Sequence, residues 1–179
     1  MSVFTNPAGA ARESAQAYTS AVLGLVEGQD PLEVLRATGG RLRALLAGRS
    51  DAELRRPERP GKWSLAHVAQ HLADSELVWG YRLRRVLAED RPTITGYDQD
   101  LWARRLDYAS ADVSAALAMF EVLRAANLRL LESATEEDLQ RVGVHVERGV
   151  ETVAHMIRLY AGHDILHLRQ IERIAAARA

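Results

Sequence analysis

Apolar residues recur at steps of three and four along four long stretches of this chain, which is the spacing of a buried helix face. The stretches cover about residues 31–47, 64–89, 110–131 and 152–176. Polar residues suited to cap a helix precede them, namely Asp30, Ser64, Ser110 and Thr152. Four amphipathic helices of this kind predict an all-α fold, a four-helix bundle.

The remaining segments predict additions to this bundle. Residues 1–29 are expected to be an N-terminal arm with a short extra helix, and residues 30–179 the bundle domain. Residues 90–109 predict a long loop between the second and third bundle helices, and a connection of that length often covers a site. Residues 142–149 are valine-rich and bounded by glycine, so they predict an extended loop or small hairpin, with His145 exposed.

The last long stretch carries His163 and His167, four residues apart. Residues at this spacing share one helix face, and both histidines continue the apolar stripe, so both rings are expected to point into the core. The spacing suits two imidazoles that bind one metal ion at about 2.0–2.1 Å. Two separate core histidines, each with its own hydrogen-bond partner, explain it equally well.

The second long stretch also contains two histidines four residues apart. His71 lies beside the buried stripe, one turn past Val68, and is the expected third metal ligand. His67 is the third residue after Ser64, where a polar side chain commonly serves the helix cap. We therefore expect His67 to be a capping or pocket residue and not a ligand; the alternative is that it serves as a fourth or substitute ligand.

Composition narrows the class of protein. The 179 residues suffice for one domain with a sizeable core, and the net charge of −1 argues against a nucleic-acid partner. The longest apolar runs are far shorter than a bilayer span, and the first residues lack the pattern of a secretory signal, so a cytoplasmic protein without a membrane partner is expected. The chain has no cysteine, so histidine, aspartate or glutamate must hold any metal.

Five fragments of the chain together resemble the DinB/YfiT-like superfamily of four-helix-bundle metalloenzymes over roughly residues 30–176. The fragments are Trp63-Ser64, the run His71-Leu72-Ala73-Asp74-Ser75-Glu76, His163-Asp164, His167-Leu168 and Gln170-Ile171. The resemblance implies that His71, His163 and His167 bind one divalent ion, commonly zinc or nickel. It also implies, from characterised relatives, a reaction that uses a low-molecular-weight thiol such as bacillithiol, mycothiol or glutathione.

Three neutral imidazoles leave at least one coordination position open, which is typical of catalytic sites. The expected function is a metal-dependent transferase that joins such a thiol to a small electrophile, in a homodimer. The alternatives are a metal-dependent hydrolase and a non-catalytic metal-binding stress protein or dimeric scaffold. The residues alone assign no further catalytic or cofactor-binding side chain.

Overall fold

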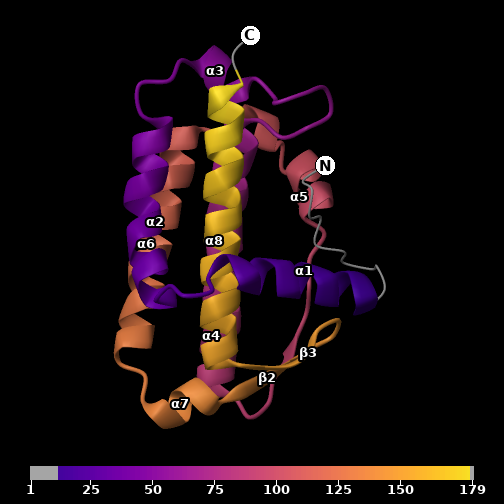
Figure 1. The fold of residues 1–179 in the computed structure, drawn as a ribbon, viewed down its shortest axis with the longest axis vertical. Coiled ribbons are helices and arrows are strands. Elements are labelled where there is room, and N and C mark those ends of the chain that lie inside the picture. Colours follow the sequence, from indigo (N-terminus) through magenta and orange to yellow (C-terminus); the bar gives the residue numbers. More distant parts are fainter. Residues whose placement is uncertain (1–11, 178–179) are drawn as a thin grey trace.

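A computed structural model describes residues 12–177, with side chains from residue 15 onward. Within this part of the chain, four long helices stand side by side with nearly parallel axes (Figure 1). They are α2 (Pro31–Leu46), α4 (Leu65–Ala88), α6 (Val113–Glu132) and α8 (Val153–Ala176). Each packs against two of the others, in the ring α2–α6–α4–α8. The predicted all-α four-helix bundle is confirmed.

Shorter elements precede the first bundle helix and connect the four. In chain order they are α1 (Arg12–Leu25), α3 (Asp51–Arg55), β1 (Thr93–Ile94), α5 (Gln99–Arg105), a 3-10 turn (Tyr108–Ser110), α7 (Glu136–Gln140), β2 (Val142–His145) and β3 (Gly149–Thr152). The strands form a small sheet in which β2 pairs parallel to β1 and antiparallel to β3. The predicted hairpin is therefore present, and the long loop contributes a strand that the sequence did not predict.

Most bundle helices begin at the predicted cap. Three caps are as predicted, because their side chains accept backbone N–H groups of the first turn. They are the carboxylate of Asp30 and the hydroxyl groups of Ser64 and Thr152. The predicted cap of the third bundle helix, Ser110, is wrong, because Ser110 lies in the 3-10 turn. Asp112 caps α6 instead, since its carboxylate accepts two N–H groups of the first turn at 2.9 and 3.1 Å.

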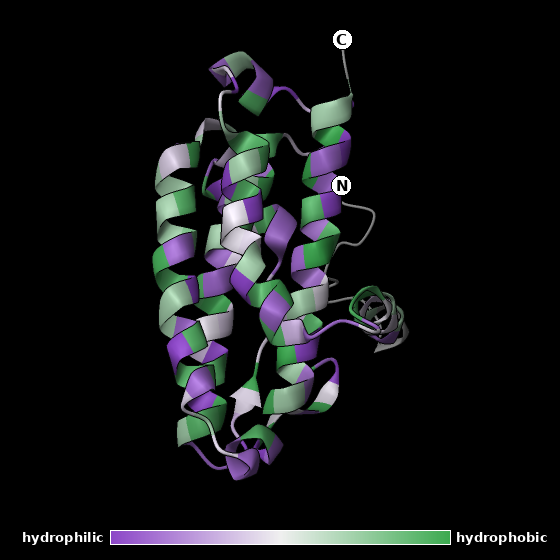
Figure 2. Cartoon of the chain, turned by 60° about the vertical axis from the view of Figure 1, so that its left-hand side comes forward, coloured by the Kyte–Doolittle hydropathy of each residue, from purple (hydrophilic) through white to green (hydrophobic). Residues whose placement is uncertain are grey.

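A layer of buried polar side chains divides the apolar interior of the described bundle. One apolar cluster includes Trp63 and Phe120, and the other includes Trp79 and Met156. The polar layer lies between them on α4, α6 and α8; its members include Glu76, Arg124, Asn127, His163, Asp164 and His167. Hydrophobic residues alternate with polar ones along every bundle helix, as their amphipathic patterns require (Figure 2). The three predicted metal ligands belong to this polar layer, since His71 is buried in it as well.

Helix α1 crosses α8 at a steep angle on the outside of the bundle (Figure 1). The crossing requires glycine at position 162, because a Cβ atom there would lie 2.1 Å from the backbone oxygen of Val22. Val22 and Val26 are buried by this contact. The predicted arm thus docks on its own bundle, although residues 1–11 lie outside the described part. No helix in residues 12–177 is long and apolar enough to cross a membrane.

Candidate metal centre

The three histidines singled out in the sequence meet in the middle of the bundle. His71 comes from α4, and His163 and His167 come from consecutive turns of α8. Each offers one ring nitrogen, and these nitrogens all lie within 4.8 Å of one another. All three residues are buried, with relative exposures of 1%, 9% and 2%. The helical spacing that predicted a shared face therefore brings the imidazoles together.

The distances between the rings fit a shared ion. Nε2 of His71 lies 3.2 Å from Nε2 of His163. Two nitrogens bound to one tetrahedral ion at about 2.0–2.1 Å are about 3.3–3.4 Å apart, so the rings need little movement to accept one. His71 also contacts the edge of His167, with ring centroids 4.6 Å apart.

The contacts of the ring nitrogens also fit the binding of a metal ion. Nδ1 of His167 lies 2.8 Å from Oε1 of Gln170, and an amide oxygen only accepts, so Nδ1 carries the proton and Nε2 keeps its lone pair. Nδ1 of His71 and of His163 has no partner among the described residues. The other ring nitrogen favours a shared ion, because Nε2 of His71 and Nε2 of His163 face each other, whereas independently satisfied core histidines would each have a separate partner.

Burial holds all three rings in the neutral form. Desolvation lowers the pKa of His163 and of His167 to about 3, assisted by Arg124 in the first case and by His163 in the second. Desolvation and the two neighbouring imidazoles also lower the pKa of His71 well below its usual value. A neutral imidazole with a free lone pair is the form that binds a metal.

His67 does not belong to this cluster. Its Nδ1 lies 2.8 Å from the hydroxyl oxygen of Ser64, which in turn accepts the backbone N–H of His67. This is the predicted capping position at the start of α4. The ring of Trp63 lies near both histidines of this helix, with its centroid 6.4 Å from that of His67 and 5.0 Å from that of His71.

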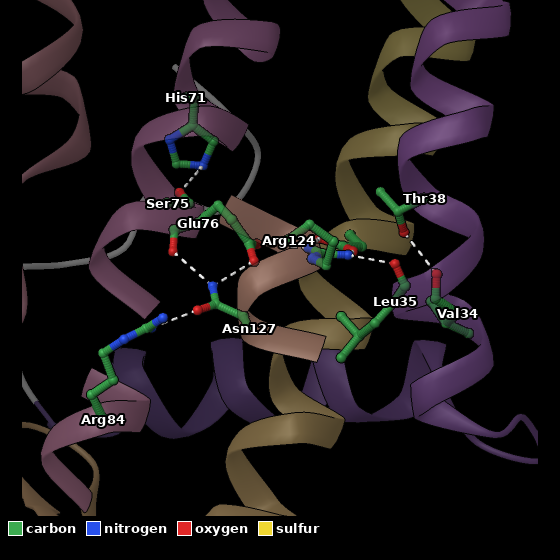
Figure 3. Close-up of polar contacts among 10 residues, drawn as sticks. Val34, Leu35, Thr38, His71, Ser75, Glu76, Arg84, Arg124 and Asn127 are labelled. Atoms are coloured by element: carbon green, nitrogen blue, oxygen red, sulfur yellow. Dashed lines mark hydrogen bonds and ion pairs between the residues drawn. The ribbon is translucent and has the colours of Figure 1, made fainter. Parts of the chain in front are cut away.

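A charged network beside the histidines was not predicted from the sequence. The guanidinium group of Arg124, on α6, donates to Asp164 at 2.7 Å and to Glu76 at 2.8 Å. Asn127 donates to the same glutamate at 2.8 Å and accepts from Arg84 at 2.6 Å (Figure 3). Burial lowers the pKa of Arg124, but the two carboxylates outweigh it and raise the pKa overall. The signal in the sequence was an arginine and an asparagine within an apolar helix face.

A cavity of about 60 Å³ adjoins His71 and His163. The predicted long loop supplies part of its wall through Tyr97 and Gln99. Tyr160 of α8 and Tyr18 of α1 line other sides. Two other residues of the long loop do not line this cavity: Asp98 caps α5, and Trp102 packs against Tyr97 with ring centroids 4.4 Å apart.

The expectation that His145 is exposed is wrong. Its side chain is buried, with 1% exposure, under the hairpin turn. Nδ1 accepts the backbone N–H groups of Glu147 and Arg148 at 3.2 and 3.3 Å, so the turn folds back over the ring. The ring serves the hairpin, and it is not part of the histidine cluster.

The fold and the cluster agree with comparisons to known proteins. The family model of the DinB superfamily matches residues 35–171, and the chain belongs to this superfamily. A Geobacillus kaustophilus protein provisionally named a metal-dependent hydrolase is 31% identical over 81% of this chain and 82% of its own length. A Geobacillus thermodenitrificans protein of the same provisional name is 36% identical over 62% of each chain.

The solved structure of YfiT from Bacillus subtilis has a similar fold. It superposes with a TM-score of 0.76 and 28% identity, over 80% of this chain and 83% of YfiT. YfiT, too, is provisionally named a metal-dependent hydrolase, and its structure is described as an unusual four-helix bundle topology. The resemblance seen in the sequence is thereby confirmed at the level of family and fold.

Proposed function

We propose that His71, His163 and His167 hold one divalent ion and that the chain is a metal-dependent hydrolase of a small molecule. The observation that carries this proposal is the convergence of three buried, neutral imidazoles next to a cavity. The provisional names of the relatives support the same reaction class. Zinc and nickel are the proposed metals, because imidazole ligands suit both.

When bound, such an ion supplies Lewis acidity, which polarises a substrate carbonyl and lowers the pKa of water or a thiol. The chain itself orients the ligands. Gln170 fixes the tautomer of His167, and Tyr160 stacks on His163 with centroids 5.4 Å apart. Groups that fix ring orientation in this way typically contribute to metal affinity.

Protein hydroxyl groups in the cavity can stabilise negative charge that develops on a substrate oxygen. The hydroxyl oxygen of Tyr97 lies 2.8 Å from that of Ser75, and the Ser75 oxygen lies 3.4 Å from Nε2 of His71. Burial raises the pKa of Tyr97, so its hydroxyl keeps its proton at neutral pH and remains a hydrogen-bond donor. A donor held in place before the reaction stabilises a developing oxyanion without reorganisation.

Transfer of a low-molecular-weight thiol, the first expectation from the resemblance, ranks second. In its favour, the chain has no cysteine, so a thiol from solution is the only thiolate source for such a site. Against it, the cavity is narrow, at about 60 Å³, so most of a molecule the size of glutathione would extend out of it. A purely structural role is the third candidate, and the cavity beside the cluster argues against it.

The test is an activity screen of untagged protein loaded with zinc or nickel. Small chromogenic esters and amides are supplied without thiol, and a bimane electrophile is supplied with each of the three thiols. The proposal predicts thiol-independent hydrolysis that His163→Ala abolishes and His155→Ala retains. Metal-dependent adducts with a thiol and no hydrolysis would establish the transferase, and no turnover in either arm would overturn both enzymes.

A further inference from the structure

The cavity beside the histidines also reaches two arginines, Arg82 and Arg148. We propose that this arginine-lined end binds an oxyanion group of the substrate, a carboxylate or a phosphate, and that Arg82 is its principal ligand. The assignment of this group to a substrate rests on the proposed function, but the binding itself does not require the metal.

Arg82 lies on the same face of α4 as the proposed metal ligand. His71, Ser75, Val78 and Arg82 occupy positions i, i+4, i+7 and i+11 of this helix, and all four line the cavity. Long helical side chains commonly lean toward the helix N-terminus, and in α4 the histidine lies on the N-terminal side of Arg82. One helix therefore presents a metal ligand and a cation to the same ligand-sized space.

Arg82 has no close carboxylate partner; Glu151, which also lines the cavity, pairs with Arg148 and acts on Arg82 only from further away. Nη2 of Arg82 donates to the backbone oxygen of Thr95 at 2.5 Å, and no ion pair involves Arg82 within the described residues. Arg148 differs, because Nε and Nη2 donate to the two carboxylate oxygens of Glu151 at 2.5 and 3.0 Å. Desolvation, followed by the nearby Arg148, lowers the pKa of Arg82. An anion in the cavity would relieve this repulsion.

Two further donors of the cavity lack partners. Trp79 and Tyr160 stack with ring centroids 4.3 Å apart and 7° between their planes, and both line the cavity. The buried Nε1 of Trp79 and the buried hydroxyl of Tyr160 have no hydrogen-bond partner among the described residues. An indole N–H can only donate, and a buried donor without an acceptor costs about 1–3 kcal/mol. Donors of this kind next to an arginine favour an acceptor-rich, negatively charged ligand.

The size of the cavity limits what it encloses. A volume of about 60 Å³ holds on the order of four to six water molecules at roughly 10–15 Å³ each. This space fits an oxyanion head and the few atoms next to it. If the anionic group of a substrate lay at the arginines, the bond to be hydrolysed would lie nearer the histidines. Arg82 and His71 occupy the two ends of the row of cavity residues on α4, as this placement requires.

Calorimetric titration of chelator-treated protein tests the proposal without any turnover. Inorganic phosphate and succinate are the probes for the two oxyanion types, and the variants are Arg82→Gln and the matched control Arg158→Gln, an exposed arginine of α8 outside the cavity. We expect saturable binding of at least one probe at one site per chain. Affinity should fall about tenfold or more in Arg82→Gln, about 1.4 kcal/mol, and stay unchanged in Arg158→Gln.

Tyr160→Phe separates binding from folding, because it removes only a hydroxyl that has no described partner. The same probe should bind this variant several-fold more weakly, with an unfolding midpoint at or above that of the wild type. Absence of saturable binding, or equal binding by Arg82→Gln, overturns the proposal. Binding that appears only after zinc is added, with equal affinity in the wild type and in Arg82→Gln, also overturns this proposal. That result would still be compatible with the proposed metal centre.

Discussion

Arg124 and Asp164 form a two-pronged ion pair inside the bundle, with Nη1 to Oδ2 at 2.7 Å and Nη2 to Oδ1 at 3.2 Å. Both side chains are almost fully buried. Asp164 directly follows His163 on α8, and the second partner of Arg124, Glu76, lies five residues after His71 on α4. One arginine of α6 therefore joins the two helices that carry the histidines.

Replacing Arg124 with methionine should destabilise the protein strongly, because Asp164 and Glu76 would remain buried without their cation. Removal of one partner of a buried ion pair typically costs about 3–5 kcal/mol. Urea unfolding measures the difference. The control is Arg43→Met, which breaks the exposed pair with Glu121 and should cost no more than about 1 kcal/mol. Equal losses in the two variants would contradict the role given to the buried pair.

Gly162→Ala should loosen α1 from α8. The new Cβ would meet the backbone oxygen of Val22, which cannot rotate away, so the helices must separate at a cost of about 1–3 kcal/mol. Hydrogen exchange should then speed up in α1 and not in the bundle helices. Gly40→Ala is the matched control, because its Cβ meets nothing within 4 Å and helix propensity predicts a gain of about 0.5–1 kcal/mol. Unchanged exchange in α1 of the Gly162 variant would refute the close contact.

The stability of the hairpin should fall in acid through His145. Burial, and then Arg148, lowers the pKa of this histidine from 6.5 to about 4, so the unfolded chain takes up its proton first as the pH falls. The contribution of neutral His145 to the free energy of unfolding is complete above pH 6.5, and it is lost as the pH falls from 6.5 to 4. His145→Asn keeps an acceptor for the turn but does not titrate. Its unfolding free energy should depend less steeply on pH in this window, and identical slopes for both proteins would argue against the buried neutral ring.

The homodimer expected from the sequence stays a prediction. The N-terminal segment is too short to form a core of its own, so it is expected to pack against the bundle or against a second subunit. Helix α1 packs on α8 of the same chain, where Val22 and Val26 are buried. Light scattering of the full-length protein should give twice the mass of one chain if the dimer exists. A monomer over a range of concentrations removes the dimer and leaves the intramolecular docking as the whole role of α1.

Helical periodicity sufficed to predict the bundle and to place His71, His163 and His167 on inward faces, because that information lies within each helix. The partners of Arg124 could not be predicted in the same way, since they lie 40 and 48 residues away on other helices. The burial of His145 depends on how its hairpin turn folds back, which alternation of residue types does not specify. The place of Arg82 in the cavity could not be predicted either. Arg82, Arg84 and Arg85 lie close together in the sequence, which is typical of a solvated helix face, and the loop and hairpin beside Arg82 come from later in the chain.

The metal content of the purified protein tests the central claim most directly. Untagged wild-type protein and its variants are digested, and their zinc and nickel are measured by mass spectrometry. The account predicts about one ion per chain in the wild type and in the control His155→Ala, and a large loss in His71→Ala, His163→Ala and His167→Ala. His67→Gln should keep its ion, since His67 caps α4. Absence of metal from the wild type after zinc or nickel is supplied, or wild-type occupancy in all three histidine variants, would contradict the assignment.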